Sequence, residues 1–225
     1  GLMMGSLRFG LRRLLTGFGT SQGLRATAEA VGVAAGRLDE LLAPALGPAD
    51  DGPLVVCPSG ALTGVPWAAL PSLAARPLSV APSGALWCAA RSVPRPARPE
   101  VVAVAGPGLL GAETEVDGVV RVDARARRLS GAEAQVGAVL DAAATASVLH
   151  LAAHGRLRTD NPLFSALELA DGPLTGYELE SLAHVPETIV LSACRSGEGR
   201  AATAEETLGL SWTLLALGAA AVVAP

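Results

Sequence analysis

The chain has 225 residues, of which 50% are hydrophobic and 17% charged, and its net charge is −4. This composition can bury a sizeable core and excludes a disordered chain, and the lack of basic excess argues against binding to nucleic acid or to a membrane surface. Its cysteines, Cys57, Cys88 and Cys194, are too few and too widely spaced for a disulfide framework or a Cys-x-x-Cys zinc site. We expect a cytoplasmic protein without metal or cofactor.

The first part of the chain has the apolar spacing of helices. Residues 5–16 and 23–43 carry an apolar stripe, and Pro44 begins a proline- and glycine-containing stop signal. Residues 1–47 are therefore predicted to form a helical arm that carries no catalytic chemistry.

Residues 48–225 are predicted to form the main domain. A short strand is expected at 54–57, and a strand or turn followed by a helix at 79–90. Three prolines and three arginines within residues 91–99 indicate a linker, which separates an N-terminal part (48–99) from a catalytic part (100–225).

From residue 100 onward, strands and helices alternate, which favours a parallel sheet with right-handed crossovers. Strands are expected at 101–105, at 119–122 or 127–129, and at 148–153, 166–169, 188–193 and 219–224, and helices at 112–118, 131–143, 176–183 and 204–217.

The tail at residues 207–225 carries no charge and nominally reaches membrane-spanning length. Small residues interrupt it, and it divides at Leu217-Gly218 into a helix-like part and a valine-rich part. We expect a buried helix followed by a buried strand here, and no membrane span.

A glycine-rich segment follows the strand expected at 101–105. Residues 106–111 match the G-x-G-x-x-G pattern of dinucleotide-binding loops. Few residues separate Gly111 from the next possible strand at 119–122, which leaves too little chain for a crossover helix. Pro107 also lacks an N–H that could face a phosphate. We therefore interpret the segment as a turn.

Two uncharged apolar runs end in chemically reactive side chains. Residues 148–153 precede His154 and Gly155, and residues 188–193 precede Cys194. If the two strands are parallel neighbours, His154 and Cys194 emerge side by side at the edge where open α/β sheets bind their ligands. A thiol beside an imidazole is a nucleophile with its base.

The other histidines and cysteines have structural explanations. His150 lies within the strand and is expected to be structural, whereas Cys57 and Cys88 are expected to be small buried residues. Cys194 differs because a polar segment beginning with Arg195 follows it, and a neighbouring guanidinium favours the thiolate.

An ordered set of motifs covers the chain from about residue 37 to its end. The motifs are VPWAALP at 65–71, APSGALW at 81–87, HLAAHG at 150–155, DNPLFSALELADG at 160–172, LTGYEL at 174–179, LSACRSGEG at 191–199 and the tail TLGLSWTLLALGAAAVVA. Together they resemble the CHAT domain family of caspase-like cysteine peptidases, in the clan of caspases and separase. Ser192 stands where caspases have Gln, and Ser196 is inserted before Gly197, so the chain is not a true caspase.

The resemblance implies an α/β fold, a caspase-like three-layer sandwich with a mostly parallel central sheet, here without the family's last strand and helix after Pro225. It implies a His–Cys dyad formed by His154 and Cys194, with the backbone amides of Gly155 and Cys194 as the oxyanion hole. It also implies tetratricopeptide-type repeats upstream or an activating protein as partners.

We hypothesise a cysteine endopeptidase that cleaves protein substrates and is latent until a partner or an upstream domain activates it. Asp160 follows His154 by six residues, and Glu198 follows Cys194 by four. Each carboxylate is a candidate for binding a basic P1 residue. The alternative is a catalytically idle caspase-like module that serves as a protein-interaction or regulatory domain.

Overall fold

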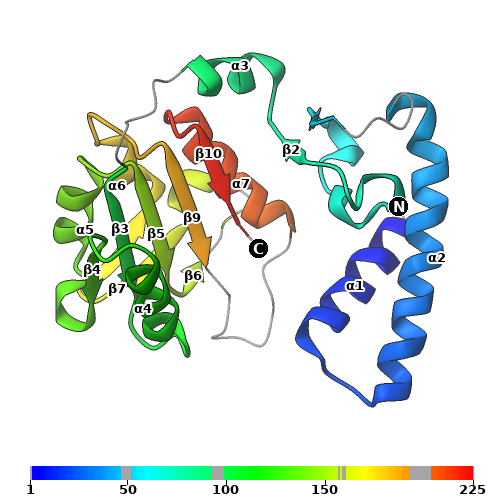
Figure 1. Ribbon diagram of the computed structural model, residues 1–225, viewed down its shortest axis with the longest axis horizontal. Helices are drawn as coiled ribbons and strands as arrows, with labels where there is room; N and C mark the ends of the chain where they lie inside the picture. Colours follow the sequence, from blue (N-terminus) through cyan, green and yellow to red (C-terminus); the bar gives the residue numbers. More distant parts are fainter. Residues whose placement is uncertain are drawn as a thin grey trace. The chain divides into compact units, whose positions relative to one another are not determined.

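Figure 1 shows the computed structural model of the chain. It describes residues 2–46, 52–92, 99–156, 158, 161–192 and 204–224. The chain divides into two compact units, residues 1–81 and 82–225. Each unit has its own apolar core, so we describe them separately.

Two helices of unequal length form a hairpin in the first unit. They are α1 (Leu2–Thr16) and α2 (Ser21–Leu46), which confirms both helices predicted from the apolar stripe. Helix α2 continues past Pro44 to Leu46, so the predicted end at residue 43 is too early, and the helix ends directly before Gly47 of the predicted stop signal. A proline this close to the helix end removes a single backbone hydrogen bond, so the last turn survives.

The remainder of the first unit packs against this hairpin. Strands β1 (Leu54–Val56) and β2 (Leu78–Val80) form a parallel pair, and between them lie the 3-10 turns η1 (Gly60–Leu62), η2 (Trp67–Ala69) and η3 (Pro71–Leu73). Arg8 Nε donates to Gly64 O at 2.8 Å, and the Asp39 carboxylate accepts from Ser72 N at 3.0 Å. The shared core consists of Leu7, Ala35, Leu38, Val65, Trp67, Leu70 and Leu73.

The second unit is built on a five-stranded sheet in the order β10-β9-β5-β3-β4, and every neighbouring pair is parallel. Its strands are β3 (Val101–Ala105), β4 (Arg127–Ser130), β5 (Val148–Ala152), β9 (Thr188–Ser192) and β10 (Ala221–Val223). A smaller antiparallel sheet holds β6 (Gly155–Arg156), β7 (Ala166–Leu169) and β8 (Gly172–Thr175). The mixed α/β class with a parallel central sheet is therefore confirmed.

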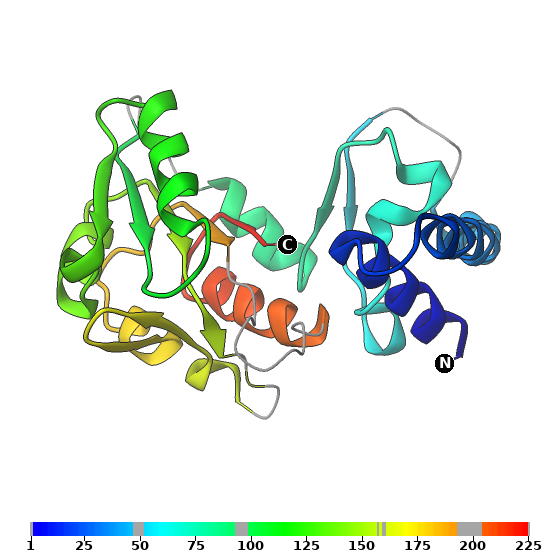
Figure 2. The same cartoon turned by 90° about the horizontal axis from the view of Figure 1, so that it is seen from below.

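Side-chain size alternates along the central strands, and each face receives different helices (Figure 2). Ala103, Ala105 and Ala152 form one face and pack against α4 (Ala112–Val122). The larger side chains of the same strands, such as Val104, Leu149 and Leu191, belong to the main core on the other face. The helices on that face are α5 (Val136–Ala143), α6 (Gly176–Glu180) and α7 (Ala204–Ala216), while α3 (Gly84–Ser92) begins the unit. This arrangement is the three-layer sandwich expected from the resemblance.

Several predicted elements need correction. Residues 119–122 are the end of helix α4 rather than a strand, so the strand lies at 127–130. The short strands β6 and β8 have no counterpart in the prediction. The tail does form a helix and a strand, but β10 is not buried, because Val223 is 56% exposed. Within the described ranges, no helix has the length and hydropathy needed to cross a membrane.

Helix α6 begins with reciprocal capping between Thr175 and Glu178. The Glu178 carboxylate accepts from the Thr175 amide at 2.7 Å and from the Thr175 hydroxyl, which itself accepts from Tyr177 N at 3.2 Å. The hydroxyl hydrogen bond holds the pKa of the Glu178 carboxyl below its usual range. The cap fixes the angle at which the chain leaves β8 and begins α6.

We expect Glu178→Ala to lower the free energy of unfolding by about 1 kcal/mol at pH 7, because the cap is lost. The folded-state pKa of Glu178 is depressed, so its contribution is present above the unfolded pKa of about 4.3 and is lost as pH falls through the folded pKa. Urea unfolding between pH 7 and about pH 3 measures both effects. Glu178→Gln is the control, since glutamine can still cap but does not titrate. A pH-independent difference between Glu178→Ala and the parent would contradict the assignment.

The approach of α1 to α2 depends on Gly10. A Cβ atom built there would lie 2.4 Å from Val31 Cγ2, at the end of a short and stiff side chain. We expect Gly10→Ala to destabilise the protein by about 1 kcal/mol, because overpacking outweighs the gain in helix propensity. Gly5→Ala, on the same helix with no atom within 4 Å of its Cβ position, should stabilise instead. Thermal denaturation that shows the same shift for both variants would refute this reasoning.

Candidate active site at the carboxyl edge of the sheet

Strands β5 and β9 are parallel neighbours in matched register. Ala152 lies opposite Ser192, and each is the last residue of its strand. On the other side of β5, Ala152 lies opposite Ala105 of β3. The prediction that the two uncharged runs pair side by side is therefore confirmed. The carboxyl ends of three strands meet at one edge, which is where open α/β sheets bind ligands.

His154 lies at the junction between the two sheets. Ala153 is fully buried after β5, and Gly155 already belongs to β6, where it lies opposite Leu167. The His154 carbonyl accepts a hydrogen bond from Glu168 N at 2.8 Å. The backbone of His154 is therefore held on one side by the parallel sheet and on the other by the antiparallel sheet, and its half-buried side chain projects at the carboxyl edge.

Gly106 lets the end of β5 and strand β7 approach the end of β3. The Gly106 amide donates to Ala152 O at 2.8 Å. A Cβ atom at Gly106 would lie 2.6 Å from Ala153 Cβ and 2.7 Å from the Glu168 carbonyl oxygen. Real Cβ atoms do not come this close to backbone, so only glycine fits without moving the residues on both sides of His154.

Gly108 lies beside the imidazole. Its φ of +72° is in the left-handed region, and a Cβ there would lie 3.6 Å from His154 Nε2. The glycine thus supplies a turn conformation that other residues disfavour, and it places no side chain of its own against Nε2. The turn at 106–108 therefore packs against His154 and the residue before it.

The connection from β3 to β4 differs from the prediction that the chain is too short here for a crossover helix. Helix α4 runs to Val122 and connects β3 to the parallel strand β4, so a crossover helix is present and chain length excludes nothing. The geometry supports a structural turn on other grounds, because Gly108 faces His154. Asp123 directly follows α4. Its carboxylate accepts a hydrogen bond from Arg125 N at 3.0 Å, and this bond lowers the pKa of the Asp123 carboxyl.

His150 lies within β5 and contacts a carboxylate of helix α4. Its Nε2 lies 2.7 Å from Glu115 Oε1 of helix α4, and 12% of its side chain is exposed. The prediction that His150 is structural agrees with this contact, which joins β5 to α4.

Arg156 and Glu168 form an ion pair next to His154 that sequence reasoning missed. Arg156 Nε lies 2.5 Å from Glu168 Oε1 across the β6–β7 hairpin. Their side chains are 66% and 30% exposed, although the Glu168 Oε1 atom itself is buried. Recognising it required the pairing of β6 with β7, and β6 is too short to have a sequence signature.

Three predicted site residues, Cys194, Asp160 and Glu198, lie outside the described residues. Gly155, the predicted oxyanion donor, is buried in β6 directly after His154. The turn after position 160 is ordered by Asn161, whose side chain accepts from Leu163 N at 3.2 Å. Among the described residues, no three His, Cys, Asp or Glu side chains gather into a group that could hold a metal ion.

Cys57 and Cys88 are exposed, so the prediction that they are buried is wrong. Cys57 directly follows β1, where the chain leaves the small two-stranded sheet. Cys88 lies on α3, and all nine residues of that helix lack full burial. The Arg91 guanidinium stacks over the neighbouring Trp87 ring at 5.0 Å from its centroid.

The layers, the parallel strand order and the histidine at the carboxyl edge define a caspase-like α/β sandwich. The family model of the CHAT domain matches residues 33–225, and the chain belongs to the CHAT domain family. The match begins within α2 and continues through both units. A comparison with curated proteins finds no match.

We expect Gly106→Ala to lower the free energy of unfolding by about 1–3 kcal/mol, because the added methyl group forces Ala153 and the Glu168 carbonyl apart. Gly137→Ala is the matched control, since Gly137 lies within α5 and has no atom within 4 Å of its Cβ position. That control should stabilise by up to about 1 kcal/mol. Urea denaturation curves compare the two. A neutral Gly106→Ala variant would show that the close approach is not required.

Proposed function

We propose that this CHAT domain is a cysteine endopeptidase whose catalytic dyad is His154 and Cys194. One observation carries the proposal, namely the register that pairs Ala152 with Ser192. In the sequence, His154 follows the first of these residues by two positions and Cys194 follows the second by two positions. Equal offsets from a paired position, on adjacent parallel strands, favour two side chains leaving the sheet at the same edge.

In this mechanism the Cys194 thiol gives its proton to His154, and the thiolate sulfur attacks the carbonyl carbon of the scissile peptide bond. The amides of Gly155 and Cys194 donate to the oxyanion of the tetrahedral intermediate. The imidazolium then protonates the leaving amine, which departs and leaves a thioester. His154 next removes a proton from a water molecule, which hydrolyses the thioester and frees the sulfur.

The described surroundings of His154 support the role of base. Hydrogen bonding of its carbonyl to Glu168 N and the burial of Ala153 limit backbone movement on both sides. The Gly108 turn lies beside Nε2 and adds no side chain of residue 108 there. A fixed base at the correct edge lowers the entropic cost of the proton transfer.

The proposed substrates are proteins, with a basic residue at P1. Asp160 and Glu198 are the proposed carboxylates for that residue, because each follows a dyad member closely in the sequence. Activation by a partner protein or by upstream tetratricopeptide-type repeats is part of the same proposal. A domain that lacks activity in every such state would instead be a regulatory caspase-like module.

The test uses a chain with both exposed cysteines replaced, Cys57→Ser and Cys88→Ser, so that Cys194 is the remaining thiol. We expect Cys194 to react with a peptide acyloxymethyl ketone, and we expect His154→Ala to slow alkylation near pH 7 by at least about tenfold, because the base that forms the thiolate is lost. Mass spectrometry of the labelled peptide measures the rate.

Two controls make this test decisive. His150→Gln removes a described imidazole that is bonded to Glu115, and it should leave the alkylation rate unchanged. Cys194→Ala should abolish cleavage of any substrate that the parent cleaves. An alkylation rate equal to that of a free thiol, and unaffected by His154→Ala, would contradict the dyad.

A P1 scan with peptide substrates tests the specificity. We expect Arg and Lys to be preferred, and Asp160→Ala or Glu198→Ala to reduce kcat/KM for these residues by about tenfold or more, because a carboxylate partner is lost. The control is hydrolysis of a substrate with an apolar P1 residue, which should not change. A preference for apolar P1 residues, unchanged in both variants, would discard these two assignments and leave the dyad untouched.

A further inference from the structure

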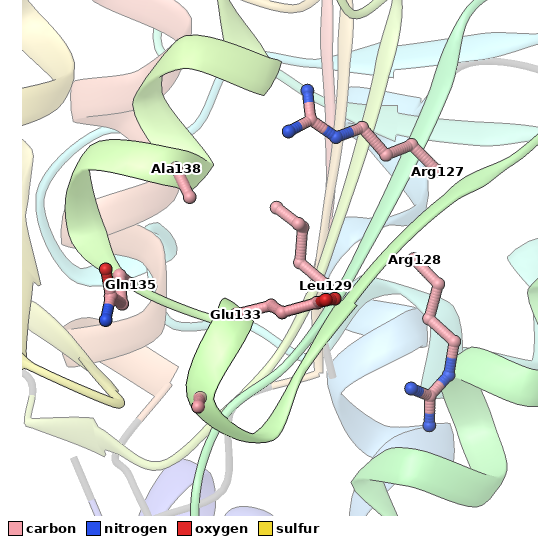
Figure 3. A pocket seen from close by; sticks show the side chains of 7 residues that line it. Arg127, Arg128, Leu129, Glu133, Gln135 and Ala138 are labelled. Carbon is pink, nitrogen blue, oxygen red and sulfur yellow. The ribbon is translucent and has the colours of Figure 1, made fainter.

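A hollow of about 550 Å³ lies beside strand β4, on the face of the sheet that also carries α5 (Figure 3). Its lining comes from β4, from the 3-10 turn η4 (Gly131–Glu133) and from the start of α5. The lining residues are Arg127, Arg128, Leu129, Ala132, Glu133, Gln135 and Ala138. The proposed peptidase chemistry uses none of them.

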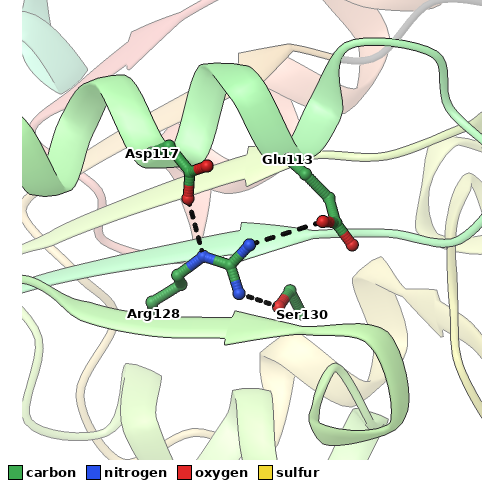
Figure 4. A network of polar contacts seen from close by, with 4 residues as sticks. All are labelled: Glu113, Asp117, Arg128 and Ser130. Atoms are coloured by element: carbon green, nitrogen blue, oxygen red, sulfur yellow. Dashed lines mark hydrogen bonds and ion pairs between the residues drawn. The ribbon is translucent and has the colours of Figure 1, made fainter.

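The two arginines of β4 have different surroundings. Arg128 turns towards α4, where its Nε lies 3.0 Å from Asp117 Oδ1 and its guanidinium also contacts Glu113 and Ser130 (Figure 4). Arg127 turns to the opposite face, into the hollow, because side chains of adjacent strand residues point to opposite faces of the sheet. Within the part of the chain that the structure describes, no carboxylate or other hydrogen-bond acceptor contacts Arg127. Its positive charge is therefore available to a ligand.

Strand β4 is an edge strand. It pairs with β3 on one side, and no described strand lies against its other side. Among the described residues, the main chain of Arg127–Ser130 makes no hydrogen bond beyond its pairing with β3. An edge of this kind offers unpaired N–H and C=O groups to an added strand.

From these observations we infer that the free edge of β4 and the adjoining hollow bind an extended peptide segment of a partner protein, which adds to the sheet as a sixth strand. Side chains two positions apart on the added strand face the hollow. The residue beside Arg127 is acidic, the residue beside Leu129 is apolar, and the residue near Glu133 is basic. The recognised pattern is acid-x-apolar-x-base, in one of the two strand directions.

Charge complementarity selects this ligand over a purely apolar or purely acidic segment. The hollow is lined by the cation Arg127, the carboxylate Glu133 and the buried side chain of Leu129, whereas the guanidinium of Arg128, its second lining cation, is ion-paired with Asp117 and Glu113. Arg127 and Glu133 both line the hollow, so both charges border the same space. A segment with two acids or two bases would meet a like charge at one end, which costs affinity.

The binding experiment uses the full 225-residue chain and two blocked heptapeptides, TETVTRT and its reverse TRTVTET. We expect one of them to shift the amide resonances of Arg127–Ser130 at or below about 1 mM peptide. Arg127→Glu should weaken that binding by at least about tenfold. Arg121→Glu is the matched control, because Arg121 is exposed on α4 and outside the hollow; it should weaken binding less than about twofold.

Two further measurements separate strand addition from simple charge attraction. The double variant Arg127→Glu, Glu133→Arg should prefer the peptide of reversed sequence. The amides of the peptide fall into two alternating sets, of which only one faces β4. N-methylation of the set that faces β4 should abolish binding, and N-methylation of the other set should leave binding intact. Arg127→Gln is a second variant without the positive charge. Thermal denaturation of this variant checks that a loss of peptide binding is not caused by unfolding.

Three results would overturn the inference. They are the absence of shifts in β4 with either peptide at about 1 mM, an Arg121→Glu effect as large as that of Arg127→Glu, and equal binding of both N-methylated sets. In those cases the arginines of β4 only protect an edge strand from aggregation. None of these results bears on the His154–Cys194 dyad, whose test measures alkylation.

Discussion

The pairing of β5 with strands on both sides is the constraint on which the rest of the second unit depends. β3 and β9 each continue in register to the last residue of β5, so Ala105, Ala152 and Ser192 lie in one row. This row fixes which side chains face α4 and which face the main core. A shift of one residue in either ladder would exchange the two faces along the whole strand, so packing on both sides locks the register.

The sequence predicted the parts of the fold whose signals are local and strong. Residues 148–153 and 188–193 are uncharged and rich in branched side chains, as expected for strands covered on both faces. Their parallel pairing followed from the alternation of strands with helices. His154 was also predictable from a local signal as a candidate site residue. It is an ionisable residue directly after an uncharged strand run, where the strand ends.

Features that depend on distant contacts were not predictable. Residues 119–122 read as a strand because three of the four are valine, yet they form the last turn of α4, where Val119 packs against the alanine face of the sheet. Strand β6 has two residues and exists because Leu167 and Ala166 lie opposite it. The role of Gly106 was also hidden, since the atoms that exclude a Cβ come from residues 153 and 168.

The two-residue junction of Ala153 and His154 between β5 and β6 sets the free-energy cost of displacing the His154 backbone. Between the last residue of β5 and the first of β6 the chain has little slack, so the His154 backbone cannot move away unless one of the two ladders opens. Such opening is a local unfolding equilibrium, and its free energy is reported by hydrogen exchange of the Glu168 amide, which bonds the His154 carbonyl. The fraction of molecules with a displaced His154 backbone is then limited by the stability of a short hairpin, and not by that of the whole domain.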